Sequence, residues 1–250
     1  MATFTNFQDI LPDPNNSIGD AGHNIGTAGP GFASVNFTSN NKISRSRTNS
    51  GKLISRAIAY HSWEISIRYN PLTREEFEPI SSFLLHRRAS FEPFFVSLPQ
   101  YQLPRNSNFS SFINSNTSLD ASSNGAAGAT IMTLAKTGYT PSSHGYPKPG
   151  DLFTITSSLN SNHTKAYMVT RVENNADWND PDGVNTAATR PGANDARIHF
   201  TPGLAKATGT GDDFVFKNPL IKVIMKSDII QYSLNTNNLY SFSLNLQEVQ

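Results

Sequence analysis

Apolar and polar residues alternate between Ala59 and Tyr69, and this alternation predicts a strand. Trp63, Ile65 and Ile67 occupy every second position, together with the histidine before them and the tyrosine after them. The positions between them are polar: Ser62, Glu64, Ser66 and Arg68. Successive side chains of a strand point to opposite faces of the sheet. The segment therefore predicts a long amphipathic strand with one buried face.

The periodicity changes after Pro71, and a helix is predicted over about residues 73–87. Thr73 suits the N-cap position, and Glu76 lies three residues further on, as in a capping box. One apolar stripe follows at helical spacing: Phe77, Ile80, Phe83 and Leu84. Pro79 lies inside the predicted helix and lacks the N–H group, so it should kink the axis or delay the start.

Three further segments are predicted to join this body as strands. The first is FASVNFT, Phe32–Thr38, the second is Phe91–Tyr101, and the third is a hairpin formed by QYSL, the turn NTNN and LYSFSLNL. An amphipathic helix between strands should pack across their sheet. We expect nine residues to form the main core: Trp63, Ile65, Ile67, Phe77, Phe83, Leu84, Phe94, Phe242 and Leu244.

Composition shifts along the chain indicate how the domains are organised. Residues 1–31 are rich in Gly, Pro, Asn and Asp, and we expect an extended N-terminal arm. Residues 104–129 are rich in Ser, Asn and Gly, which predicts a linker or long surface loop. TIMTLA, DLFTITSS, KAYMVTRVE and RIHFTPGL predict an inserted small antiparallel β-barrel over 130–215. The main β domain would then comprise residues 32–103 and 216–250.

Overall composition removes several classes of function. The formal net charge is +1, which makes no general case for nucleic-acid or acidic-membrane binding. The chain has no cysteine, so disulfide frameworks and thiolate metal sites are excluded, and a reducing compartment fits. The sequence has neither the pattern of a secretory signal nor an apolar stretch of about 18 residues. We therefore expect a soluble protein without a membrane partner.

Positive charge is nevertheless concentrated between Ser39 and Arg56. Five cations lie there, with no acidic residue among them: Lys42, Arg45, Arg47, Lys52 and Arg56. The pattern fits a solvated loop or a long hairpin. Contact with a nucleic-acid backbone is a weaker interpretation, because no aromatic residue is interleaved for base stacking.

Motifs that could carry catalysis or bind a cofactor are missing. His61 and Glu64 lie three apart on a predicted strand, so their side chains point to opposite faces. Ala176–Asn185 resembles a calcium loop, but the register places Trp178 at its first ligand position. No G-x-S-x-G elbow and no G-x-x-x-x-G-K-[ST] cradle occurs. We predict no enzyme, no cofactor and no metal site.

Several segments, in order, resemble tail proteins of tailed bacteriophages. The first is an alternating W-x-I-x-I strand, followed by a P-L-[ST]-R-x-E turn, a helix containing F-L and a P-F-x-x-x-x-P strand. They correspond here to Trp63–Ile67, Pro71–Glu76, Phe83–Leu84 and Pro93–Pro99. KPGDLFTI and RIHFTPGLAKATGTGDDFVF resemble the entry and closing strands of an inserted barrel in such proteins, and YSFSLNLQEV resembles a return strand.

The resemblance implies a mainly β fold of the distal-tail or tail-tube class: a tail-tube-like β-barrel or sandwich with one flanking α-helix, plus the small barrel. It implies a structural tail protein that forms a ring, six-fold by analogy, at the junction of tube and baseplate. Such a ring would continue the DNA channel, anchor baseplate or adsorption proteins, and assemble in the bacterial host cytoplasm. The five cations of residues 42–56 would then contact adjacent subunits.

Two competing functions remain open at this point. A carbohydrate-binding or receptor-binding β-domain of a virion would use Trp178, Tyr139 and Tyr146 as stacking platforms. This alternative is the weaker one, because the three aromatic residues lie in separate loops. A hydrolase is the third possibility, and no constellation of residues supports it.

Overall fold

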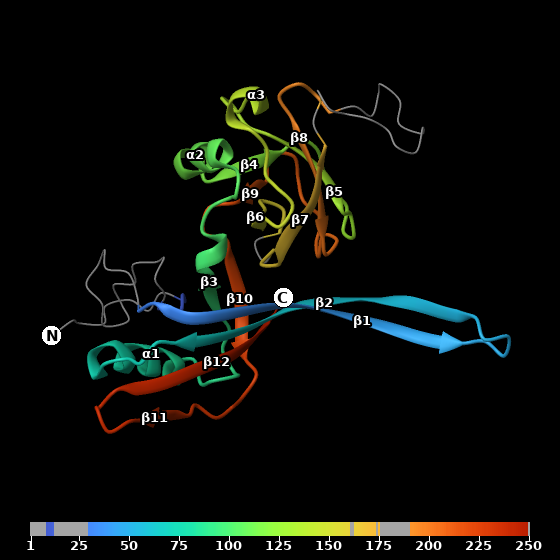
Figure 1. Cartoon of the computed structure of the whole chain (residues 1–250). Coiled ribbons are helices and arrows are strands. Elements are labelled where there is room, and N and C mark those ends of the chain that lie inside the picture. The colour runs from blue at the N-terminus through green and yellow to red at the C-terminus, as the bar shows by residue number, and fades with distance from the viewer. Residues whose placement is uncertain (1–8, 13–29, 161–162, 174, 176–190, 250) are drawn as a thin grey trace. The chain divides into compact units, whose positions relative to one another are not determined.

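The computed structural model describes residues 9–12, 30–160, 163–173, 175 and 191–249, without the side chains of 57–60. The chain divides into two compact units (Figure 1). Unit 1 comprises Met1–Val96 and Lys222–Val249, and unit 2 comprises Ser97–Ile221. Strands dominate both units, so the prediction of a mainly β protein is confirmed.

Unit 1 is built on one sheet whose strands differ in length. Their order is β1-β2-β12-β10-β3, and β11 pairs with β12. The strands are β1 Phe32–Arg47, β2 Leu53–Tyr69, β3 Phe94–Ser97, β10 Leu220–Met225, β11 Tyr232–Leu234 and β12 Tyr240–Glu248. The register places Val35 and Leu244 on either side of Ile67. Because these three residues share a face, the alternation predicted for each strand produces one continuous apolar surface.

Helix α1, Arg74–His86, covers the apolar face of this sheet. Its capping box is formed, with the backbone N–H of Thr73 donating to Glu76 Oε2 at 2.9 Å. The helix continues through Pro79. Phe77 stacks on Tyr240 with ring centroids 4.5 Å apart, and Phe83 meets Phe94 edge to face. The nine residues expected in the core are all buried, each at most 4% exposed.

The basic segment between the first two strands is a hairpin rather than a loop. β1 and β2 continue pairing from Asn41↔His61 to Arg47↔Leu53, past the other strands of the sheet (Figure 1). Gly51 occupies the turn with a φ of +80°, a conformation that glycine adopts without steric cost. We call residues 41–61 the hairpin arm. At about 3.3 Å per residue, its paired part reaches about 20 Å.

A short N-terminal segment closes the β3 border of the sheet. Ile10 forms a parallel bridge with Phe95, and the backbone N–H of Leu11 donates to Phe95 O at 2.8 Å. Leu11 is completely buried, and Asp9 forms an ion pair with Arg87. The rest of the N-terminal arm expected over 1–31 lies outside the described residues, apart from its last two.

Unit 2 contains a closed antiparallel barrel in the order β4-β5-β8-β7-β6-β9. Its strands are β4 Ser118–Ala121, β5 Ile131–Ala135, β6 Leu152–Thr156, β7 Ala166–Glu173, β8 Ala196–Thr201 and β9 Asp213–Val215. The four strands expected for the inserted barrel correspond to β5, β6, β7 and β8. Phe153 lies at the centre of the aromatic core of the barrel, against Tyr167, Phe200, Phe214 and Phe216.

The expectation of a linker over residues 104–129 is wrong, because a helix and a strand form there. Helix α2 is Ser107–Asn116, and β4 follows it. Asn106 caps the helix, its Oδ1 accepting from the backbone N–H of Asn108 at 3.1 Å. Phe109 and Ile113 are completely buried in the barrel core, which offsets the low helix propensity of Ser and Asn. Two short helical turns, η1 Pro99–Tyr101 and α3 Pro141–His144, complete unit 2.

Candidate functional site

The face of the unit 1 sheet opposite α1 is polar across three strands. The register aligns three rows of side chains from β1, β2 and β12: Ser34–Arg68–Ser243, Asn36–Ser66–Asn245 and Thr38–Glu64–Gln247. Ser66 Oγ donates to Asn245 Oδ1 across the strands at 2.8 Å. An antiparallel sheet can expose one polar face to water, so this face needs no covering layer.

One charged pair on the polar face neutralises itself. Lys226 Nζ lies 2.6 Å from Glu64 Oε2, and Asn40 Nδ2 donates to Glu64 Oε1 at 2.8 Å. The hydrogen bonds from Lys226 and Asn40 hold the pKa of Glu64 below its ordinary value. Glu64 is therefore ionised at neutral pH and balances the charge of Lys226.

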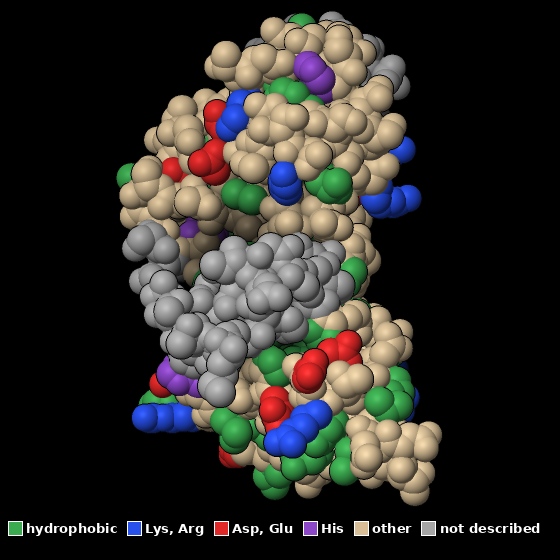
Figure 2. Space-filling model, turned by 90° about the vertical axis from the view of Figure 1, so that its left-hand side faces the viewer, with side chains coloured by type: hydrophobic (Ala, Val, Ile, Leu, Met, Phe, Trp, Pro, Cys, Tyr) green, Lys and Arg blue, Asp and Glu red, His purple; other side chains and the backbone are tan. Residues whose placement is uncertain are grey.

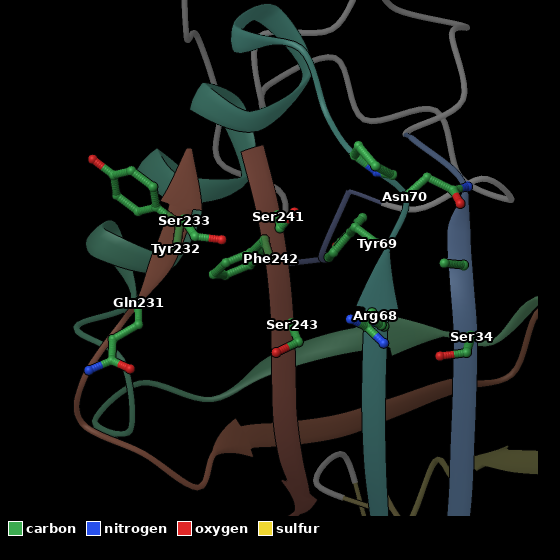
Figure 3. Close-up of a pocket in the computed structure, with 12 residues that line it drawn as sticks. Ser34, Arg68, Tyr69, Asn70, Gln231, Tyr232, Ser233, Ser241, Phe242 and Ser243 are labelled. Carbon is green, nitrogen blue, oxygen red and sulfur yellow. The ribbon is translucent and has the colours of Figure 1, made fainter. Parts of the chain in front are cut away.

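Arg68 is the one cation in the three rows of side chains, and it lies in an open groove. The groove has a volume of about 700 Å³ and is lined by residues of β1, β2, β11 and β12. Figure 3 shows Arg68 between Ser34 and Ser243, on three neighbouring strands. Ser241 also lines the groove, and no acidic residue does. The side chain of Arg68 is exposed, and it has no ion-pair partner within the described part of the chain.

The hairpin arm is a second surface with unusual chemistry. All five predicted contact cations lie on it and are exposed: Lys42, Arg45, Arg47, Lys52 and Arg56. Ile43, Leu53 and Ile54 are also exposed there, each at 48% or more. The other 15 Lys and Arg residues stand against 19 Asp and Glu, so the rest of the chain is net acidic. Figure 2 shows Asp and Glu side chains of unit 1 lying among hydrophobic ones.

The candidate chemical motifs of the sequence are placed as follows. His61 is buried beside Trp63, and its Nε2 lies 3.0 Å from Ser39 Oγ, while Glu64 is on the polar face. No group of three His, Asp or Glu side chains in the described ranges could hold a metal ion. The calcium-like loop Ala176–Asn185 lies outside them. None of the helices found in those ranges has the length and apolarity needed to cross a membrane.

Of the three aromatic residues proposed to stack on a carbohydrate, Tyr139 is buried. Tyr139 is only 3% exposed, and its hydroxyl donates to the carbonyl of Gly145 at 2.7 Å. Burial also raises the pKa of Tyr139. Tyr146 packs against the barrel core, and Trp178 lies outside the described residues. Sequence patterns missed the burial of Tyr139 because its neighbours Phe109 and Phe112 belong to the unexpected helix α2.

A buried histidine in unit 2 makes the stability of the barrel depend on pH. His163 is 4% exposed, and its Nε2 lies 2.6 Å from the hydroxyl of Tyr167. That hydroxyl accepts from the backbone N–H of Ala205 at 2.8 Å. Burial, with a smaller effect of Lys206, lowers the pKa of His163 to about 4. The folded barrel therefore keeps this imidazole neutral in mildly acidic solution.

We expect unit 2 to lose stability as the pH falls from about 6.5 to about 4. In this window the unfolded chain binds a proton at His163 that the folded chain excludes, so acid favours unfolding. The full effect is about 3 kcal/mol. Urea denaturation at several pH values measures it, and His163→Gln should flatten the profile while the exposed His86→Gln should not. An unchanged pH profile for His163→Gln would contradict the assignment.

Comparisons with known proteins point in one direction. A family model described as the N-terminal part of the A domain of distal tail protein pb9 matches residues 11–101. Distal tail protein pb9 of Escherichia phage T5 is 28% identical over 241 residues, which cover 95% of this chain and 98% of that protein. The resemblance to phage tail proteins of the distal-tail class is thereby confirmed.

Proposed function

We propose that the protein is a structural tail component of the phage distal-tail class and forms a six-fold ring at the junction of the tail tube and the baseplate. The ring would continue the DNA channel, and the virion tail is its place of action. Its role would be that of a scaffold rather than an enzyme, with assembly in the bacterial host cytoplasm. The barrel of unit 2 would anchor baseplate or adsorption proteins.

The observation that carries this proposal is the asymmetry of the unit 1 sheet. One face is buried under α1, and the other is polar, largely uncharged and open. An open polar face suits the wall of an aqueous channel through which a polyanion passes. Rings of identical subunits arise when one patch of a subunit meets a different patch of the next copy.

The hairpin arm is the subunit contact that we propose for this ring. A two-stranded hairpin is marginally stable alone in water, and this one exposes three large apolar side chains. Its charge is opposite to that of the rest of the chain. A neighbouring copy would bury Ile43, Leu53 and Ile54 and balance Lys42, Arg45, Arg47, Lys52 and Arg56.

Neutralising two arm cations should weaken the ring. We expect Arg45→Gln with Arg47→Gln to shift the purified protein from rings toward smaller species, because opposite charges between copies are lost. Sedimentation velocity and negative-stain microscopy measure the change, and high salt should act in the same direction. The matched control is Arg88→Gln with Lys148→Gln, two exposed cations outside the arm.

The outcomes separate two parts of the proposal. Wild-type protein that stays monomeric at high concentration and never enters particles would contradict the ring itself. Rings that form equally well with the arm pair and the control pair would contradict only the role of the arm.

A further inference from the structure

We infer that the groove around Arg68 is a phosphate-contact site for duplex DNA passing over the polar face of the sheet. The inference rests on the proposed channel function and adds the residue that touches the polyanion. It concerns one groove of about 700 Å³, formed by strands β1, β2, β11 and β12 of unit 1.

The groove brings together the donor groups that a phosphodiester requires. Arginine presents N–H groups in a planar fork that fits phosphate oxygens. The register places Ser34 and Ser243 directly beside Arg68 on the neighbouring strands (Figure 3). Ser241 lies two residues before Ser243 on β12 and therefore faces the same side. Serine hydroxyls also donate to phosphate oxygens. Four donor side chains from three strands therefore face the same space.

Among the described residues that line the groove, Arg68 is the charged one. Lys226 is neutralised by Glu64 at 2.6 Å, so it contributes little net attraction for an anion. No carboxylate lines the groove of Arg68 to compete with a phosphate. A protein partner that offered a carboxylate would find in this groove one cation among Ser, Asn, Gln and aromatic residues. Each copy in the proposed ring offers one Arg68. A polymer with regularly repeated anionic groups can therefore contact several copies at once.

The site suits transient contact rather than tight binding. Phosphate contacts carry no sequence information, so a duplex could move across them without regard to its sequence. One arginine per copy gives a weak contact whose strength depends on salt. The groove is open, and Tyr232, which also lines it, turns its ring to the other face of the sheet, against Phe77 of α1.

Duplex binding by the full chain tests the inference. Fluorescence anisotropy with a labelled duplex of about 30 base pairs is measured across a salt series. Arg68→Gln should weaken binding about 3- to 10-fold at low salt and reduce the slope of log affinity against log salt by at least about 0.9, the value for one phosphate contact. Arg68→Lys should restore most of the slope. Arg88→Gln, an exposed cation beside α1, should leave both unchanged.

Two outcomes would overturn the inference, and one control separates it from the proposed ring. If Arg68→Gln binds the duplex with wild-type affinity and slope, the inference is overturned. If polyglutamate binds in an Arg68-dependent manner as tightly as the duplex, a carboxylate partner replaces DNA and the inference is also overturned. Negative-stain images are recorded for both proteins, and Arg68→Gln is expected to form rings like the wild type. If the wild-type protein forms no rings, the proposed function fails, whatever the DNA-binding result.

Discussion

Replacing Phe153 with alanine is expected to lower the free energy of unfolding of unit 2 by about 3–5 kcal/mol, as is usual for a phenylalanine deleted from a core. Phe153 is completely buried at the centre of the barrel. Its ring lies 5.2–5.5 Å, centroid to centroid, from those of four other aromatic residues: Tyr167, Phe200, Phe214 and Phe216. These four residues come from three of the strands and from the segment after β9. The cavity left by the substitution would therefore weaken the packing between several strands of the barrel.

Urea denaturation followed by hydrogen exchange of peptides from β5 to β8 measures this loss within unit 2. The matched control is Leu159→Ala, which removes a leucine that is 65% exposed in the same unit. We expect this control to change stability by about 0.5 kcal/mol or less. A loss of under about 1 kcal/mol for Phe153→Ala would mean that the barrel interior is not close-packed around this ring.

Sequence patterns predicted the elements in which one face is buried and the other is wet. The alternation around Trp63 and the capping box at Thr73 each correspond to an element that the structure contains. The same logic failed for α2, where the apolar residues are few and Ser and Asn fill the remaining positions. Strand β4 was missed because it lies in the Ser/Asn/Gly-rich segment that was expected to be a linker, and β9 because it is three residues long and follows a Gly-rich turn.

The hairpin arm and the Arg68 groove show why surfaces are harder to predict than cores. Side chains of the arm from Asn41 to Arg56 are exposed on both faces apart from the half-buried Thr48, so no alternation distinguishes a hairpin from a loop there. The groove joins Ser34, Arg68 and Ser243, which are far apart in sequence and carry no motif. Only the strand register brings them into one row. The groove's set of donor side chains therefore depends on the pairing of β1, β2 and β12, which no local pattern in the sequence predicts.

Replacing Phe83 with alanine is expected to destabilise unit 1 by about 3–5 kcal/mol and to raise the concentration at which the proposed rings form. Phe83 is 1% exposed, meets Phe94 of β3 at 5.4 Å, and lies beneath the guanidinium of Arg87 at 5.5 Å. The ring therefore joins α1 to the β3 border of the sheet. Domains have a total stability of about 5–15 kcal/mol, so a loss of this size leaves the sheet marginal.

Tryptophan emission can follow unit 1 alone, because the chain has two tryptophans and only Trp63 lies in unit 1. In a Trp178→Phe background, Phe83→Ala should shift the urea midpoint of Trp63, whereas Leu85→Ala on the same helix, 64% exposed, should not. Only the folded sheet could join the proposed ring, so the unfolding equilibrium of unit 1 and the assembly equilibrium are linked. A lower midpoint together with rings at the wild-type concentration would therefore show that the sheet is not the body that assembles. The expected result, loss of both, would make the packing of the Phe83 side chain a determinant of the proposed assembly.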